Sequence, residues 1–185
     1  MGKNTKSSKS EDIKNPILKI DNLSKWFPIN NVWKKRIGWL KALDNVSLSI
    51  RKGEILGIVG ESGCGKSTLG KTIMGIHTLT NGNISFEGSE IGYMKPSESK
   101  NLRRRLQYTY QDPGSSLDPR WKIGKSLSEP LEIHTSLSKI ERQQRVEDIL
   151  KAVNLPITHL DLYPHEISGG QQRRVGLARI LTLHP

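Results

Sequence analysis

Cysteine, aromatic residues and long apolar runs are all scarce in this chain of 185 residues. The single cysteine, Cys64, excludes an internal disulfide, and a cytoplasmic location fits best. No stretch approaches the ~18–20 uninterrupted apolar residues of a membrane-spanning helix, and no apolar segment of a secretory signal follows the polar N-terminus. Hydrophobic residues at 34% and charged residues at 25% are typical of a globular protein, which excludes wholesale disorder.

Acidic residues are also fewer than basic ones: the chain has 18 Asp or Glu and 29 Lys or Arg. Residues 1–52 hold 12 basic residues against 4 acidic ones, whereas residues 53–100 hold 4 against 5. The excess therefore lies in residues 1–15, which we expect to be a disordered basic tail, and in a loop expected at Asn30–Lys41. These segments are either simply solvated or attracted to an anionic membrane surface. No base-reading module accompanies the charge, so we do not expect nucleic acid as a partner.

Apolar periodicity predicts an α/β chain whose later part is mainly helical. Strands are predicted at Ile17–Ile20, Val46–Ile50, Glu54–Val59, Ile84–Phe86 and Leu106–Tyr110. The segment Glu54–Val59 is almost wholly apolar, which is typical of a strand buried on both faces. Helices are predicted at Thr68–Ile76, after a capping box formed by Ser138 and Glu141, and from about Ser168 onward.

A glycine-rich run between the predicted strand and the first helix matches the phosphate-loop pattern G-x-x-x-x-G-K-[ST] in full. It reads Gly60-Glu61-Ser62-Gly63-Cys64-Gly65-Lys66-Ser67. Glycines let backbone N–H groups turn toward an anion, and the helix that follows presents its positive dipole end to the same phosphates. Lys66 can reach the β- and γ-phosphates, the Ser67 hydroxyl can ligate Mg²⁺, and Thr68 adds a hydroxyl near the α-phosphate. We expect the Cys64 side chain to point away from the phosphates.

A second glycine motif lies about a hundred residues later, at Ile167-Ser168-Gly169-Gly170-Gln171. Ser168 is predicted to cap a helix behind two glycines, which creates a second anion-binding helix start. Two phosphate-binding sites in one chain indicate either two ligands or one ligand shared by two subunits.

With both motifs, the chain resembles the ATP-binding subunits of ABC transporters, whose signature is LSGGQ. The resemblance implies a P-loop NTPase core with an antiparallel β subdomain and an α-helical subdomain. It also implies a homo- or heterodimer in which two such subunits pair head to tail. Each ATP would then lie between the phosphate loop of one subunit and Ser168, Gly169, Gly170 and Gln171 of the other.

The same resemblance implies individual roles. Gln111 would be the Q-loop glutamine, which senses Mg²⁺ and the γ-phosphate and contacts a membrane subunit. Lys66 and Gln111 would act in catalysis, and Ser67 and Gln111 would ligate Mg²⁺. Phe27 would stack on adenine, with Trp26 as the alternative. The implied ATP-binding set comprises Phe27, Gly60, Glu61, Ser62, Gly63, Cys64, Gly65, Lys66, Ser67, Thr68 and Gln111.

Within the family, the segment Gln111–Arg120 is similar to that of oligopeptide and dipeptide importers, although nickel importers share much of it. This implies membrane permease subunits as partners, an extracytoplasmic solute-binding protein as an indirect one, and a place on the cytoplasmic face of the membrane. The implied division is a tail at 1–15, a nucleotide-binding core with the β subdomain at 16–110, a Q-loop and helical subdomain at 111–166, and the signature motif with its helix at 167–185.

The family pattern also calls for a Walker B strand ending in Asp-Glu, a D-loop and a switch histidine, none of which occurs in the sequence. The Asp would help to hold Mg²⁺ and the Glu would polarise the attacking water. We therefore expect a truncated or split version of a larger ATPase subunit. The alternative is a nucleotide-binding module without turnover that pairs with a complete subunit.

Overall fold

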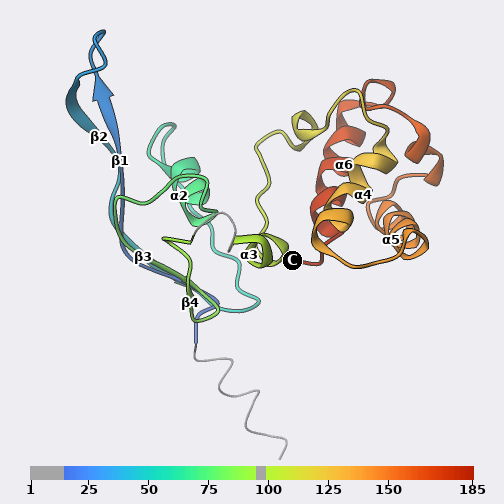
Figure 1. The fold of residues 1–185 in the computed structure, drawn as a ribbon, viewed down its shortest axis with the longest axis horizontal. Coiled ribbons are helices and arrows are strands. Elements are labelled where there is room, and N and C mark those ends of the chain that lie inside the picture. The colour runs from blue at the N-terminus through green and yellow to red at the C-terminus, as the bar shows by residue number, and fades with distance from the viewer. Residues whose placement is uncertain (1–14, 95–98) are drawn as a thin grey trace, which may run out of the picture. The chain divides into compact units, whose positions relative to one another are not determined.

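The computed structural model of the protein describes residues 15–94 and 99–185 (Figure 1). The chain divides after Pro96 into two compact units, which are described separately below. Except for Asn15, the predicted basic tail at 1–15 lies outside the described residues. Along the part of the chain that the structure describes, no helix is both long enough and apolar enough to cross a membrane.

The first unit contains a four-stranded antiparallel sheet in the order β2-β1-β3-β4. Its strands are β1 (Leu18–Asn30), β2 (Arg36–Ile50), β3 (Asn81–Phe86) and β4 (Ser89–Glu90). Ile20 on β1 lies opposite Ile84 on β3, and these two side chains and that of Leu23 are at most 1% exposed. The strands predicted at 17–20, 46–50 and 84–86 are confirmed as parts of β1, β2 and β3, although Ile17 precedes β1.

Strands β1 and β2 continue beyond the rest of the sheet as a two-stranded arm, residues 25–41, shown in blue in Figure 1. Strand β3 pairs with β1 only from Leu18 to Ser24, whereas β1 and β2 stay paired as far as Asn30 opposite Arg36. The prediction of a loop at Asn30–Lys41 is therefore wrong outside residues 31–35. The aromatic and aliphatic residues of the arm pair across the hairpin, as Phe27 does with Leu40, which favours strands over a loop.

The glycine-rich run leads into helix α2 (Lys66–Ile73), which packs on β2. This confirms the first predicted helix, although α2 ends three residues earlier than expected. The strand predicted at Glu54–Val59 is absent, and Ile55 and Val59 are each 97% exposed. A strand satisfies its N–H and C=O groups through a neighbouring strand. Among the described residues none pairs with this segment, so its apolar composition alone does not produce a strand.

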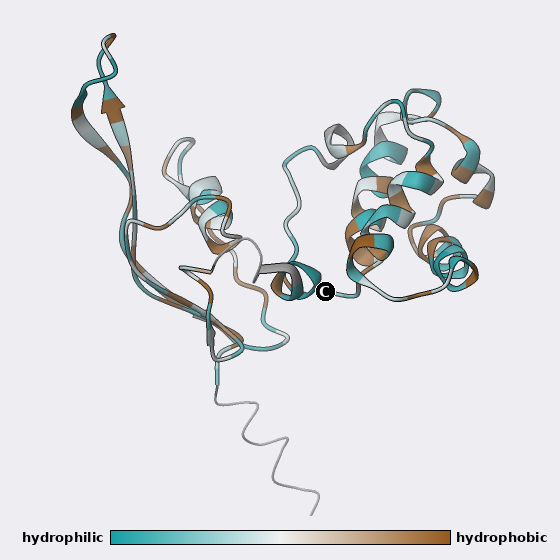
Figure 2. Cartoon of the chain, viewed as in Figure 1, coloured by the Kyte–Doolittle hydropathy of each residue, from teal (hydrophilic) through white to brown (hydrophobic). Residues whose placement is uncertain are grey.

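The second unit is helical and has a core of its own. Its elements are α3 (Ser99–Arg105), η1 (Pro113–Ser116), α4 (Ile123–His134), α5 (Lys139–Ala152), η2 (Ile157–Asp161), η3 (Pro164–Glu166) and α6 (Gly169–Leu181). Apolar and polar residues alternate around α4, α5 and α6 (Figure 2), and Leu127, Leu150 and Val175 are completely buried. The strand predicted at Leu106–Tyr110 is wrong, because this segment follows α3 as irregular chain.

Candidate functional site

The phosphate loop turns into α2 at Gly65, the residue that precedes the first helical position. Gly63 and Gly65 adopt left-handed backbone conformations, with φ of 85° and 99°. A Cβ atom on Gly65 would lie 2.4 Å from the carbonyl oxygen of Ala42 on β2, so only glycine lets the helix start approach the sheet this closely. The loop therefore holds the exposed N–H groups of the first turn of α2 next to β2.

Lys66 folds back over the loop that precedes it. Its Nζ atom donates to the carbonyl oxygens of Gly60 at 2.7 Å and Glu61 at 2.6 Å. The ammonium group therefore lies among the residues predicted to surround phosphate, with protein carbonyls as its hydrogen-bond acceptors. Phosphate oxygens are stronger acceptors for an ammonium group than carbonyls because they carry charge. The arrangement fits an anion that would take the place of these carbonyls.

The Cys64 side chain lies beside the ammonium group of Lys66, and its orientation relative to bound phosphates stays a prediction. Its Sγ atom lies 3.4 Å from Lys66 Nζ and would be 2.7 Å from a Cβ atom placed on Gly60. The absence of a side chain at Gly60 therefore leaves room for the sulfur.

Phe27, the predicted adenine platform, lies half-buried on β1 beside the end of the α2 segment. Its ring makes an edge-to-face contact with His77, with ring centroids 5.3 Å apart, and Lys25 Nζ lies 4.9 Å from its centre. Burial, followed by the positive charges of Lys25 and Lys71, lowers the pKa of His77 below its usual 6.5. At neutral pH His77 is therefore an uncharged ring that supports Phe27. Sequence reasoning missed this contact, because a lone histidine gives no local signal of its partner.

Trp26, the alternative platform, has a different environment. Its backbone N–H donates to Thr80 Oγ1 at 2.9 Å, and Lys41 Nζ lies 4.8 Å from its ring centre. Its indole Nε1 is buried and has no acceptor within the described part of the chain. Both residues contact the segment that follows α2, Phe27 through His77 and Trp26 through Thr80, so the choice of Phe27 as the platform stays a prediction.

The second glycine motif forms the start of α6, as predicted. Ser168 is the N-cap: its Oγ accepts from the N–H of Gln171 at 3.3 Å, and Gln171 Oε1 accepts from the N–H of Ser168 at 2.8 Å. Gly169 and Gly170 are exposed, and a Cβ atom on either would meet nothing within 4 Å. The helix start is thus held open on its outer side, where an anion can approach its N–H groups.

Gln111 is exposed and lies just before η1, the segment that packs on α6. A Cβ atom on Gly114 of η1 would lie 3.1 Å from Gln172 Cβ, so the two elements approach closely. Arg179 holds the other end of this contact: its guanidinium donates to Glu129 at 2.5 Å and to the carbonyl oxygen of Ser116 at 3.5 Å. The segment after Gln111 and the signature helix therefore form one packed body within the second unit.

Sequence reasoning did not single out Gln172 or Arg179, although both stabilise this body. Gln172 Nε2 donates to the carbonyl oxygens of Pro164 at 2.7 Å and Ile167 at 3.4 Å. Both residues follow the signature in sequence, but nothing local marks them as links to η3, η1 and α4.

The predicted residues thus fall into two groups. Phe27 and Gly60–Thr68 belong to the first unit, and Gln111 and Ser168–Gln171 belong to the second. A Mg²⁺ site built from Ser67 and Gln111 would draw on both units and stays a prediction. In the described ranges, no cluster of three or more His, Cys, Asp or Glu side chains could hold a metal ion.

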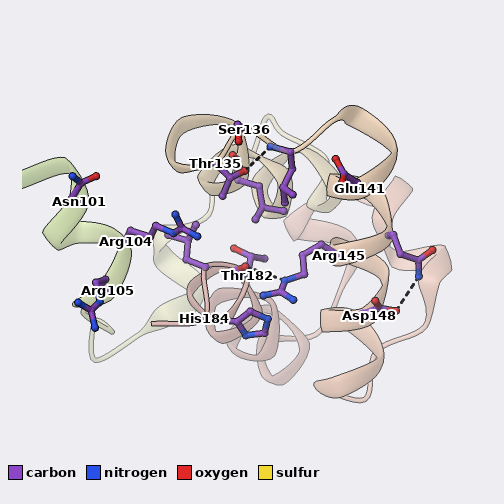
Figure 3. Close-up of a pocket in the computed structure, with 14 residues that line it drawn as sticks. Asn101, Arg104, Arg105, Thr135, Ser136, Glu141, Arg145, Asp148, Thr182 and His184 are labelled. Carbon is purple, nitrogen blue, oxygen red and sulfur yellow. Dashed lines mark hydrogen bonds between the residues drawn. The ribbon is translucent and has the colours of Figure 1, made fainter. Parts of the chain in front are cut away.

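An open cavity of about 840 Å³ also lies in the second unit (Figure 3). It is lined by α3, the end of α4, α5 and the end of α6, and Arg145 in it donates to the carbonyl oxygen of Thr182 at 3.2 Å. Arg104, Arg145, Glu141 and Asp148 give it mixed charge. None of the predicted site residues lines it.

The ABC transporter family model matches residues 43–185, which include the phosphate loop, the Gln111 segment and the signature helix. The chain belongs to the ABC transporter family. It is 43% identical over 171 residues to the oligopeptide transport ATP-binding protein AppF of Bacillus subtilis, which covers 91% of this chain and 52% of that protein. The chain therefore spans about half the length of the curated relative it matches.

Solved structures of the family have the same fold. The dimeric ATP-binding cassette MJ0796, in a post-hydrolysis state bound to ADP and Pi, matches with a TM-score of 0.80 and 29% identity, over 91% of this chain and 70% of that one. The protein cbiO1 of Clostridium perfringens, part of the ABC transporter complex cbiONQ, matches with a TM-score of 0.73 and 28% identity, over 93% of this chain and 63% of that one. The fold is therefore that of an ABC ATPase, with an antiparallel β part and a helical part, as the sequence predicts.

Proposed function

We propose that this chain binds MgATP as part of the ATP-binding subunit of an ABC importer for peptides. The observation that carries the proposal is Lys66, whose ammonium group lies over the phosphate loop on the carbonyl oxygens of Gly60 and Glu61. ATP phosphates would replace these carbonyls, the N–H groups at the start of α2 would bind the same phosphates, and Phe27 would stack on adenine.

Pairing with a second ATP-binding subunit follows from the open start of α6. Gly169 and Gly170 leave this helix end accessible, and Ser168 and Gln171 fix its geometry. In the proposed dimer, these residues contact the nucleotide held by the phosphate loop of the other subunit. The dimeric MJ0796 cassette supports this arrangement.

Mg²⁺ would be held by the Ser67 hydroxyl and the Gln111 side chain, together with phosphate oxygens. Both are oxygen donors, which Mg²⁺ prefers. Gln111 lies just before η1, so the segment that packs on the signature helix would also contact the permease. These contacts would place the chain at the cytoplasmic face of the membrane, and the oligopeptide relative favours a peptide over nickel as the transported solute.

The decisive experiment is titration of the 185-residue chain with ATP and Mg²⁺ by calorimetry. Removing an ammonium group that binds a charged acceptor should weaken binding by about 10–100-fold, so we expect that loss for Lys66→Ala. Lys52→Ala makes the same change of charge at an exposed residue outside the loop and should bind as the unmodified chain does. Equal affinities for Lys66→Ala and Lys52→Ala would contradict the proposal.

A further inference from the structure

The end of the β1–β2 arm exposes apolar side chains on a two-stranded ribbon. Val32 is 98% exposed and Trp33 is 88% exposed at its turn, and Ile37, Trp39 and Leu40 on β2 are exposed as well. Three of the four tryptophans of the chain lie in this arm, although aromatic residues make up only 5% of the sequence. Two paired strands alone are marginally stable in water, so an exposed apolar arm gains from contact with a partner.

The turn at the end of the arm is held in one conformation by Asn31. Its Oδ1 atom accepts from the N–H of Trp33 at 3.1 Å and from the N–H of Lys35 at 2.9 Å. Backbone hydrogen bonds between Asn31 and Lys35 and between Lys34 and Asn31, both 2.9 Å long, close the same turn. Val32 and Trp33 are therefore presented outward from an ordered turn.

The arm is also basic throughout. From Asn22 to Leu43 the sequence contains no Asp or Glu, while its basic residues are Lys25, Lys34, Lys35, Arg36 and Lys41. Several cations lie beside aromatic rings: the Arg36 guanidinium is 4.8 Å from the centre of the Trp39 ring, and Lys41 Nζ is 4.8 Å from that of Trp26. The arm therefore combines an apolar tip with a group of cations directly behind it.

We propose that this arm binds the surface of an anionic lipid bilayer. Val32 and Trp33 enter the headgroup region, where tryptophan is enriched, and Lys34, Lys35 and Arg36 contact lipid phosphates. The basic residues of the arm are complementary to a negatively charged bilayer, which favours the bilayer as the partner. The surface of such a bilayer is negative, and each basic residue near it adds a similar increment of binding.

Other occupants fit the arm less well. A stable protein interface buries about 800 Å² on each partner around a closely packed centre, whereas here the most exposed apolar residues are two neighbours at the tip of a narrow ribbon. Nucleic acid would use the cations but would leave Val32 without a role. Both remain outcomes that the experiment below can reveal.

The test is co-sedimentation of the 185-residue chain with vesicles of phosphatidylcholine alone and with vesicles of phosphatidylcholine and phosphatidylglycerol in equal amounts. We expect binding to the anionic vesicles only, and a steep fall in binding when salt is raised from about 0.1 M to about 0.5 M. The triple variant Lys34→Glu, Lys35→Glu, Arg36→Glu should bind the anionic vesicles at least about 100-fold more weakly. Trp33→Ser should bind about tenfold more weakly.

A matched control separates the arm from the overall charge of the chain. The triple variant Lys52→Glu, Lys139→Glu, Lys151→Glu reverses the same number of charges at exposed residues elsewhere and should bind about as well as the unmodified chain. Far-UV circular dichroism of every variant shows whether the fold is kept, and the salt dependence of the unmodified chain tests the charge contribution without any substitution.

Three outcomes would overturn the proposal. Equal losses in the two triple variants would mean diffuse attraction by net charge. Equal binding to both kinds of vesicle would mean apolar insertion without recognition of anionic lipid, as the exposed segment Glu54–Val59 could provide. Absence of binding to anionic vesicles would leave a protein or nucleic acid as the partner of the arm. Binding of ATP at the phosphate loop is a separate measurement, so either proposal can fail without the other.

Discussion

Gly65 controls how closely the start of α2 approaches β2. Its φ of 99° is strained for any residue with a side chain, and its missing Cβ atom would collide with the carbonyl oxygen of Ala42. The sequence pattern predicts that this position is glycine because of the phosphate. The structure adds a second reason for glycine at this position that involves no ligand: the loop must fit closely against β2.

The substitution Gly65→Ala should therefore lower the free energy of unfolding of the first unit by at least about 2 kcal/mol. Gly53→Ala is the matched control: Gly53 also has a positive φ, 78°, but a Cβ atom there would meet nothing within 4 Å. It should cost about 1 kcal/mol. Urea unfolding followed by tryptophan fluorescence reports mainly on this unit, which holds three of the four tryptophans. Equal losses in the two variants would show that the contact with Ala42 does not matter.

Among the secondary-structure elements, α6 connects most of the helical unit. Its first turn carries the signature, its middle is buried against α4 and α5, and Arg179 near its end reaches Glu129 on α4 and Ser116 in η1. The two charged side chains are 32% and 25% exposed, so water screens this pair only in part.

Replacing Arg179 by Met keeps much of the side-chain volume but leaves Glu129 without its cation. We expect Arg179→Met to lower the stability of the helical unit by about 2 kcal/mol. The double variant Arg179→Met, Glu129→Gln should regain part of that loss, because no partly buried charge is then left unpaired. Thermal unfolding followed by circular dichroism at 222 nm measures both. A double variant less stable than Arg179→Met would contradict this account of the pair.

Helix starts could be predicted from the sequence, whereas two of the predicted strands are absent from the structure. Ser138 with Glu141 and Ser168 with Gln171 form capping boxes within four residues, so the signal is local. The segments Glu54–Val59 and Leu106–Tyr110 have the composition of strands, but a strand exists only where another strand pairs with it. That partner is a property of the whole fold. The error in the arm is the opposite one. A loop is predicted at Asn30–Lys41, but residues 36–41 belong to β2 and pair with β1.

At the scale of the whole molecule, the segment Glu54–Val59 leaves apolar side chains exposed that a complete core would bury. Ile55 and Val59 are almost fully exposed, and Leu56 and Ile58 are partly exposed. The relative from Bacillus subtilis is about twice as long as this chain. The sequence predicts the fold family correctly, but whether the segment Glu54–Val59 forms a strand depends on a partner strand far away in the fold.

This segment should make the 185-residue chain bind apolar dyes. We expect the double variant Ile55→Ser, Val59→Ser to bind markedly less 8-anilinonaphthalene-1-sulfonate and to self-associate less, because a continuous apolar surface is removed. Ile140→Ser changes a single exposed isoleucine on α5, 82% exposed, and should have little effect. Dye fluorescence and light scattering measure the two properties. Unchanged dye binding in the double variant would show that the segment is covered in solution.

The position of Lys66 has a consequence for how a nucleotide enters the loop. In the structure, the ammonium group is held by the carbonyl oxygens of Gly60 and Glu61. In the proposed binding of ATP, two internal hydrogen bonds would therefore break as bonds to phosphate form at the same nitrogen atom. The affinity for a nucleotide would then be the difference between two sets of contacts, and association would include a rearrangement of the lysine side chain.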